Sequence, residues 1–262
     1  MARRRFFVDQ VRKGEAEITG DEAHHLTRVL RVEAGQKFEI SDGARVWLAS
    51  VEEARKAVVR FAVLEELPAG PELPPVTLYL ALIKFDRFEW AVEKATELGV
   101  ARIVPVQAER SDYGLFQGSQ KRGERWRRIA HEAGEQSRRL RPPEVAEAVK
   151  FADAVKSAAA HRIWLDEQPG AKPLAAAFSF APGDTVSHDT DSGDTLPGDT
   201  LPNDSCSLLI GPEGGWADSE RHALAAAGWT GASLGPMVLR AETAVCAALA
   251  VVSQMWMAAH AE

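Results

Sequence analysis

Hydrophobic and polar positions follow one pattern before residue 67 and another after residue 75. In the first part, apolar and polar residues alternate over short stretches, with the period of a half-buried strand. These stretches cover 37–41, 45–49 and 58–64. The Asp42-Gly43 pair predicts a hairpin turn, and residues Glu22 to Leu30 predict a short helix capped by Asp21. Several short strands around one helix predict a small β-barrel.

A proline-rich segment separates the two patterns. Residues 67–75 include four prolines and one glycine, which stiffen the chain and remove backbone donors. We therefore predict a first domain over residues 1–70 and a second over residues 75–262.

The second domain alternates between apolar runs and amphipathic stretches. Residues 76–83 form a continuous apolar run, as expected for a strand covered on both faces of a parallel sheet. Residues 87–98 have helical periodicity and end before Gly99, a residue that suits a helix C-terminus. Similar patterns predict strands at 102–106, 161–165, 207–210 and 232–234, and helices at 118–139 and 218–227. This alternation indicates an α/β fold with a mostly parallel sheet flanked by helices.

The most apolar stretch runs from Ala244 to Ala261 and is interrupted by Ser253, Gln254 and His260. It is barely long enough to cross a bilayer. A helix that is apolar on nearly all sides more often packs in a core or a dimer interface. We predict that role here, and no membrane partner.

The net charge of −7 is distributed unevenly. Six aspartates lie within 182–204, and without them the chain would carry a net charge of −1. Eight lysines and arginines lie between Lys121 and Arg141, against three glutamates. This basic segment predicts either a surface for nucleic acid or a solvated helix face. In the second case its arginines would pair with Glu124, Glu132 and Glu135.

The acidic segment 182–204 contains the sequence Gly-Asp-Thr-Leu-Pro twice in succession. It is polar and poor in large apolar residues, so it buries too little surface to fold alone. We predict a disordered surface insertion with no part in catalysis.

Several chemistries lack the residues that they need. The two cysteines form no Cys-x-x-Cys pair and the histidines have no spacing typical of zinc ligands, so we predict no metal. The sequence contains no Walker loop, dinucleotide-binding glycine motif or Gly-x-Ser-x-Gly turn. The basic N-terminus lacks the apolar region of a signal peptide, which together with the few cysteines predicts a cytoplasmic protein.

Two glycine-bearing stretches near the C-terminus point most directly to a function. Each is an apolar run that stops at a Gly-Pro pair and leads into a helix-forming segment, at 208–216 and at 234–244. Glycine lets a ligand approach the backbone closely, and proline makes the bend rigid. Two such bends at the ends of two strands would form opposite walls of one small-molecule pocket. The second stretch would place an arginine, a carboxylate and a hydroxyl beside it.

These two stretches resemble the cofactor-binding motifs of the RsmE family of ribosomal RNA methyltransferases, in the SPOUT superfamily. The resemblance extends over the whole chain. Further matching segments are Arg5–Val8, His25-Leu26, Val29–Arg31, Asp42-Gly43, Glu93–Val100, Glu109–Ser111 and Glu135–Arg138. Two features depart from the family pattern. Met237 stands where the family usually has arginine, and the insertion 182–204 is absent from most relatives.

The resemblance implies a SPOUT-type trefoil-knotted catalytic domain and an N-terminal PUA-like barrel that binds RNA. It implies a homodimer that uses S-adenosyl-L-methionine to methylate N3 of one uridine in 16S ribosomal RNA, near the decoding region of the small subunit. The substrate would be the free RNA or the assembled subunit. The residues expected to bind the cofactor are Leu165, Ile210, Gly211, Pro212, Glu213, Gly214, Gly215, Leu234, Gly235, Val238, Leu239 and Thr243.

The remaining roles follow from charge and chemistry. We expect Arg240 to stabilise negative charge on the uracil carbonyls, because an arginine stays protonated and presents a fork of donors. Glu242 would orient Arg240 or accept the N3 proton, or would instead compensate the helix dipole. The arginines expected to contact RNA are Arg5, Arg28, Arg31, Arg110, Arg138 and Arg139. Two rival functions remain open: methylation at another RNA position, and an assembly factor that binds RNA without catalysis.

Overall fold

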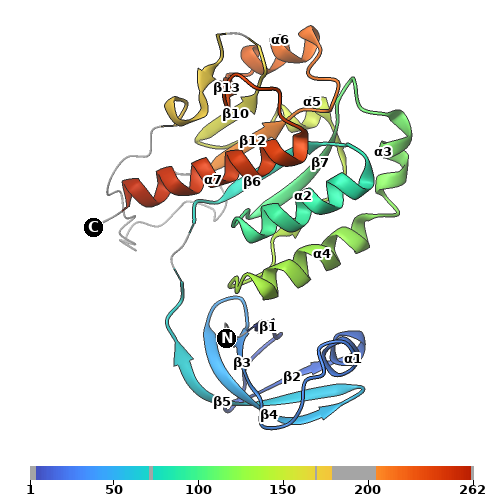
Figure 1. The fold of residues 1–262 in the computed structure, drawn as a ribbon, viewed down its shortest axis with the longest axis vertical. Helices are drawn as coiled ribbons and strands as arrows, with labels where there is room; N and C mark the ends of the chain where they lie inside the picture. Colours follow the sequence, from blue (N-terminus) through green and yellow to red (C-terminus); the bar gives the residue numbers. More distant parts are fainter. Residues whose placement is uncertain (1–3, 71–72, 169, 179–204, 261–262) are drawn as a thin grey trace, which may run out of the picture. The chain divides into compact units, whose positions relative to one another are not determined.

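The computed structural model describes residues 4–70, 73–168, 170–178 and 205–260, and Figure 1 labels their helices and strands. The chain divides into two compact units. Unit 1 comprises residues 1–72 with 131–142, and unit 2 comprises residues 73–130 with 143–262. The predicted insertion at 182–204 lies outside the described residues.

Unit 1 contains a curled five-stranded sheet and one helix, α1 (Gly20–Arg28). The strands lie in the order β1 (Arg5–Phe7), β3 (Lys37–Ser41), β4 (Val46–Arg55), β5 (Val58–Leu67) and β2 (Glu15–Thr19). Neighbouring strands are antiparallel except β1 and β3, which are parallel. Two register irregularities between β4 and β5 increase the local twist, so that the sheet curls around Phe6, Ile40 and Phe61.

The turn between β3 and β4 confirms the predicted hairpin. The Asp42 carboxylate accepts hydrogen bonds from the backbone amides of Ala44 and Arg45, and Gly43 has φ +86°. The predicted cap of α1 is wrong. Helix α1 begins at Gly20, so Asp21 lies inside the first turn, where its charge favours the positive end of the helix dipole.

Unit 2 is built on a sheet in which all paired strands are parallel. The strands lie in the order β11 (Lys172–Pro173), β13 (Thr230–Ser233), β10 (His161–Leu165), β12 (Cys206–Ile210), β6 (Val76–Ala81), β7 (Arg102–Gln107) and β8 (Glu144–Val145), and β9 (Val149–Lys150) also pairs with β7. The helices are α2 (Phe85–Glu97), α3 (Tyr113–Ser119), α4 (Gly123–Gln136), α5 (Phe151–Ala154), η1 (Leu174–Ala176), α6 (Asp218–Ala226) and α7 (Ala241–Ala259).

Alternate residues of the central strands divide between two hydrophobic cores. Leu78 and Leu80 of β6 pack in the core shared with α2, α4 and α7, and Figure 1 shows α2 and α7 lying across the sheet. Tyr79 and Ala81, one residue out of phase, pack in the core shared with α5 and α6. This arrangement explains the continuous apolar run of β6, because a strand covered by helices on both faces needs apolar residues at every position. It confirms the predicted α/β class.

Pro105 lies within β7, an interior strand, although proline cannot donate to a sheet ladder. On one side β7 pairs with β6, where Pro105 is opposite Leu80. On the other side it pairs with β8 through residues 102 and 103, and with β9 through 106 and 107. Pro105 therefore sits in the gap between two short partners, where no amide donor is required.

The helix predicted over 118–139 is confirmed over Gly123–Gln136 as α4, but its predicted start is wrong, because residues 113–119 form a separate helix, α3, with a break at residues 120–122. Two backbone hydrogen bonds of the tight, three-residue type mark the break, from Lys121 to Gly118 and from Arg122 to Ser119. After the break, Trp126 packs fully buried against Phe88 of α2, with ring centroids 4.4 Å apart. The helical periodicity continues across the break, so sequence pattern alone could not locate it.

Helix α7 is the one helix of the described residues that is long and apolar enough to span a membrane by length and composition. One face of it, including Val245, Ala248 and Val252, is buried in the main core of unit 2. This burial confirms the prediction of a core-packing helix for this part of the sequence.

Candidate functional site

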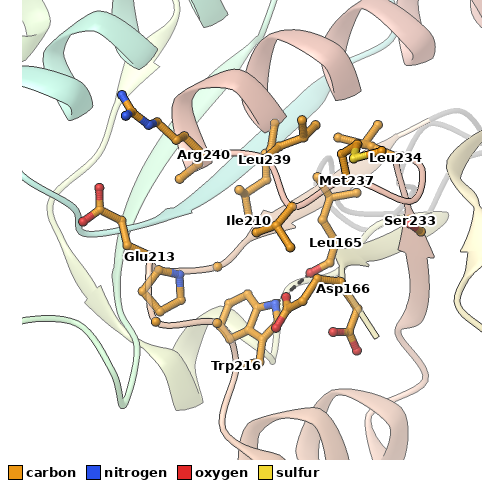
Figure 2. A pocket seen from close by; sticks show the side chains of 18 of the residues that line it. Leu165, Asp166, Ile210, Glu213, Trp216, Ser233, Leu234, Met237, Leu239 and Arg240 are labelled. Atoms are coloured by element: carbon orange, nitrogen blue, oxygen red, sulfur yellow. Dashed lines mark hydrogen bonds between the residues drawn. The ribbon is translucent and has the colours of Figure 1, made fainter. Parts of the chain in front are cut away.

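A cavity of about 530 Å³ opens where β12 and β13 end, and the loops that follow these strands line it. The predicted opposition of the two Gly-Pro bends across one pocket is therefore confirmed. The lining residues are Arg87, Leu165, Asp166, Glu167, Ile210, Gly211, Pro212, Glu213, Gly214, Gly215, Trp216, Ser233, Leu234, Gly235, Met237, Val238, Leu239, Arg240, Ala241 and Ala244. Figure 2 shows Leu165 and Ile210 between the two loops, with Trp216 below them.

The glycines of the first loop are required by close neighbours. A Cβ on Gly211 would lie 2.9 Å from the Trp216 ring, and a Cβ on Gly215 would lie 2.6 Å from Glu167 Oε1. Gly215 also has φ +68°, which disfavours any side chain. Trp216 is 1% exposed and donates from Nε1 to the carbonyl of Leu165 at 2.8 Å (Figure 2). The loop is therefore held by packing beneath it and leaves its backbone facing the cavity.

Helix α6 fixes the far end of this loop. The buried Glu220 accepts from the amide of Ala217 at 3.0 Å and from the amide of Glu109 at 2.8 Å. Arg221 donates to Asp166 and to the carbonyl of Trp216. Glu220 and Arg221 of α6 thus connect three segments that are distant in sequence, and their hydrogen bonds make the first loop rigid.

The second loop is much more open. Gly235 has φ +134°, and Met237 and Val238 are 74% and 84% exposed. Arg240 precedes α7, and among the residues that the structure describes its guanidinium has no ion pair or side-chain hydrogen bond. Figure 2 shows Arg240 and Glu213 at the same end of the cavity. A free guanidinium at the rim can meet a negatively charged or carbonyl-rich ligand.

Arg87 of α2 links the two loops. Its guanidinium forms an ion pair with Glu213 of the first loop, and its Nε lies 3.9 Å from Glu242 Oε1, in the first turn of α7. The side chain of Glu242 is 12% exposed, and its Oε2 is buried without a hydrogen-bond partner. An oxygen in this state can accept a proton or a hydrogen bond from a ligand.

Eleven of the twelve residues predicted to bind the cofactor line this cavity, and Thr243 does not. Of the predicted catalytic pair, Arg240 lines it, whereas Glu242 lies next to the lining residue Ala241. Sequence reasoning missed Arg87, Asp166, Glu167, Trp216, Ser233, Met237, Ala241 and Ala244 as lining residues. The acidic Asp166-Glu167 pair directly follows β10, and the ends of parallel strands are where ligands bind in α/β sheets, so strand order could have suggested it.

Comparison with known proteins identifies the family. The profile of an RNA methyltransferase domain matches residues 71–253, and that of an RNA methyltransferase PUA domain matches residues 18–61. Ribosomal RNA small subunit methyltransferase E of Synechocystis is 34% identical, over 94% of this chain and 75% of the relative. The enzyme of the same name from Mycobacterium tuberculosis is 33% identical, over 94% and 90%.

The chain belongs to the ribosomal RNA small subunit methyltransferase E (RsmE) family. Two solved structures agree with this assignment. RsmE from Neisseria gonorrhoeae, bound to S-adenosyl methionine, superposes with a TM-score of 0.78 at 25% identity, and covers 97% of this chain and 98% of its own. A putative methyltransferase from Legionella pneumophila, in complex with the same cofactor, gives 0.80 at 26% identity and 99% coverage of both chains.

The arginines predicted to contact RNA are in different states. Arg28, Arg31, Arg110 and Arg138 are exposed, and burial lowers the pKa of Arg139 to about 10. Arg5 is only 9% exposed, donates twice to Glu39, and donates to the carbonyl of Arg138 at 2.6 Å. Because its donors are already engaged inside unit 1, Arg5 has little left to offer a phosphate. Its placement indicates a structural role in place of the predicted RNA contact.

The basic segment does not pair as its own sequence suggested. Arg122 and Arg125 form ion pairs with Glu89 of α2, at 3.2 and 2.7 Å. Glu135 instead lies 3.5 Å from Arg4. Arg125 of α4 and Arg122 just before it thus fix this helix to α2, and a solvated face of internal pairs is not what forms.

Proposed function

We propose that this RsmE family member methylates N3 of a uridine in 16S ribosomal RNA, near the decoding region of the small subunit, with S-adenosyl-L-methionine as methyl donor. One observation carries the proposal: the two Gly-Pro loops line a single cavity whose rim bears an arginine without a partner. The family supplies the reaction class, and its members in complex with S-adenosyl methionine supply the donor.

The residues around the cavity fit such a donor. Its volume of about 530 Å³ lies within the range of small-molecule sites. The walls combine apolar side chains, such as Leu165 and Ile210, with backbone left accessible by the glycines. Oε1 of Glu167 pairs with Arg221 at 3.1 Å, and the side chain is 45% exposed, so its second oxygen can accept from sugar hydroxyls. The first turn of α7 contributes Ala241 to the lining and presents backbone amides suited to a carboxylate.

S-adenosylmethionine supplies an electrophilic methyl group. The protein must then activate the uracil, whose N3–H is a weak acid and a poor nucleophile at neutral pH. Arg240 donates to the uracil carbonyls, where negative charge collects as N3 loses its proton. Glu242 accepts that proton through its unpartnered Oε2, either directly or through one water. Arg87 holds Glu242 near the first loop and keeps the two walls in register.

Further assignments follow from the family. Residues 1–70 act as a PUA-like RNA-binding domain, and residues 75–262 as the methyltransferase domain. The enzyme is a cytoplasmic homodimer, and the apolar surface of α7 that remains outside the core, including the half-exposed Met257, supports a second copy as partner. The substrate is 16S ribosomal RNA, free or within the assembled small subunit.

Mass spectrometry of ribosomal RNA tests the reaction directly. Small subunits from a strain that lacks its RsmE homologue are incubated with this protein and S-adenosylmethionine, and nucleosides are then analysed. We expect N3-methyluridine at one position with the wild type and none with Arg240→Ala. Arg102→Ala, on an exposed part of β7, is the matched control and retains full activity. A methylated nucleoside of another kind would disprove the N3 assignment.

Calorimetry with S-adenosylmethionine separates the enzyme from an assembly factor that lacks catalysis. One feature favours the assembly factor: Met237 stands where the family resemblance leads us to expect arginine. An enzyme binds the donor with a dissociation constant near the micromolar range, whereas a factor without catalysis does not bind it.

A further inference from the structure

Three metal-ligating side chains converge in unit 1, away from the cavity of unit 2. Glu22 belongs to α1, and His131 and Glu135 belong to the last part of α4. A spacing of four residues places His131 and Glu135 on one face of their helix. One ligand atom from each of the three residues can be chosen so that all lie within 4.8 Å of one another. Ligands bound at about 2.1 Å to a common ion would need only a small further approach.

Two carboxylate oxygens in this group are buried without partners. Glu135 is 2% exposed, and its Oε1 has no hydrogen bond. Oε1 of Glu22 is also buried without a hydrogen bond, 3.5 Å from Nε2 of His131. Burial raises the pKa of Glu135 to about 8 and that of Glu22 to about 7, with a smaller contribution from Asp9 to the latter. Buried polar atoms in native proteins nearly always have a partner, so these oxygens call for a ligand.

Neighbouring residues hold the three side chains in place. Nε of Arg4 lies 3.5 Å from Oε2 of Glu135, and Nη2 of Arg4 donates to the carbonyl of Glu132 at 3.3 Å. The Phe7 ring meets the His131 ring edge-on, with centroids 5.1 Å apart. Gly134 allows this approach, because a Cβ there would lie 3.2 Å from the Phe7 ring. Geometry fixed before a ligand arrives is what a binding site requires.

We propose that Glu22, His131 and Glu135 bind one divalent cation of the zinc class. One imidazole nitrogen with two carboxylate oxygens suits zinc better than magnesium or calcium, which prefer oxygen ligands alone. The side chains of Glu22 and His131 are 38% and 32% exposed, so an ion can enter from that side. Three protein ligands leave the fourth position to water. Such an ion fastens α1 to residues 131–142 and so stabilises unit 1.

The prediction of no metal rests on ligand spacings within short stretches of the chain. Here one ligand lies more than 100 residues before the other two. Only the His-x-x-x-Glu spacing within α4 was visible, and that spacing is common on helices. The site depends on tertiary structure, which brings α1 against the end of α4 within unit 1.

Calorimetry on the full chain, stripped with EDTA and titrated with Zn²⁺, tests the proposal. We expect one saturable site, and at free Zn²⁺ of about 100 times the dissociation constant a rise in melting temperature of roughly 5–10 °C. Co²⁺ in the same site should give visible d–d absorption bands that Zn²⁺ removes. These readouts need neither S-adenosylmethionine nor RNA, so they are independent of methyltransferase activity.

The variants Glu22→Gln, His131→Gln and Glu135→Gln should each weaken Zn²⁺ binding at least tenfold. His222→Gln removes an exposed histidine of α6 and serves as the matched control for adventitious binding, with unchanged affinity expected. Melting curves in EDTA show whether each variant folds. If the buried Glu135→Gln does not fold, the two more exposed positions decide the question. Absence of saturable binding to the wild type, or wild-type affinity in Glu22→Gln or His131→Gln, overturns the proposal.

Discussion

Single glycines decide whether the first loop can line a cavity at all. Gly215 combines a positive φ with a neighbour, Glu167, only 2.6 Å from where a Cβ would lie. The sequence identified this residue through its motif, but not the carboxylate beside it. That neighbour comes from the segment after β10, and no local pattern relates the two positions.

Gly215→Ala should therefore weaken cofactor binding as well as stability. Left-handed backbone costs an L-residue about 1–2 kcal/mol, and displacement of Glu167 disturbs the cavity wall. Isothermal calorimetry should show at least a tenfold higher dissociation constant for S-adenosylmethionine. Gly35→Ala is the control, because Gly35 has φ +86° with nothing within 4 Å of a Cβ. It should lose similar stability and no affinity. Equal affinities for both variants would remove Gly215 from the cavity wall.

Met237 stands where the family resemblance leads us to expect arginine, and it is 74% exposed and lines the cavity. Restoring the family residue with Met237→Arg should leave the melting temperature unchanged. Binding to 16S ribosomal RNA should become tighter, and the slope of log affinity against log salt should steepen by roughly 0.7–0.9 for one added phosphate contact. Ala225→Arg, at an exposed position of α6, is the matched control. A slope that does not differ from the control would show that position 237 faces no phosphate.

At the scale of elements, hydrophobic periodicity predicted the strands and helices of unit 2 well, because burial on both faces leaves a continuous pattern. Prediction from periodicity failed where the backbone geometry changes but the hydrophobic pattern of the sequence does not. The break between α3 and α4 keeps helical periodicity on both sides, and Pro105 is tolerated only because β8 and β9 leave a gap opposite it. Such features depend on neighbours that the local sequence does not contain.

Helix α2 contributes to the cavity through a contact that no sequence motif predicted. Arg87 pairs with Glu213 of one loop and approaches Glu242 beside the other. Its side chain is 29% exposed and that of Glu213 is 41% exposed, so solvent screens the pair and its contribution is about 1 kcal/mol at most.

Arg87→Gln should accordingly raise the dissociation constant for S-adenosylmethionine by about fivefold. Its effect on turnover should be larger, because Glu242 also loses its positioning. Steady-state kinetics with ribosomal RNA separates the two effects. Arg102→Gln removes an exposed pair with Glu144 at the distant β7–β8 edge and should change neither. Wild-type affinity and turnover in Arg87→Gln would show that the loops hold their positions without this bridge.

For the whole molecule, sequence reasoning located the cavity because both loops carry their own motifs. It could not foresee that residues 131–142 belong with unit 1, since their first part continues α4, a helix that begins in unit 2. That assignment also explains Arg5. Its partners are Glu39 and the carbonyl of Arg138, which lies in the added segment. A charge that sequence alone assigns to RNA is thus used to hold unit 1 together.

The net charge of −7 makes the arginines that remain free decisive for RNA binding. Substituting Gln at Arg28 or Arg31, both exposed, should leave stability within about 0.5 kcal/mol and lower the salt slope by nearly one each. Arg110 does not belong to this set, because its guanidinium donates to the carbonyl of Gly214 at 2.9 Å. Arg5→Gln should behave in the opposite way, because it leaves the largely buried Glu39 without its main partner. We expect a loss of about 3 kcal/mol in the free energy of unfolding, with the salt slope unchanged for the folded fraction. Denaturant unfolding and filter binding at several salt concentrations measure both quantities on each variant. If Arg5→Gln instead kept full stability and lost one unit of slope, its guanidinium would have to leave Glu39 for a phosphate when RNA binds.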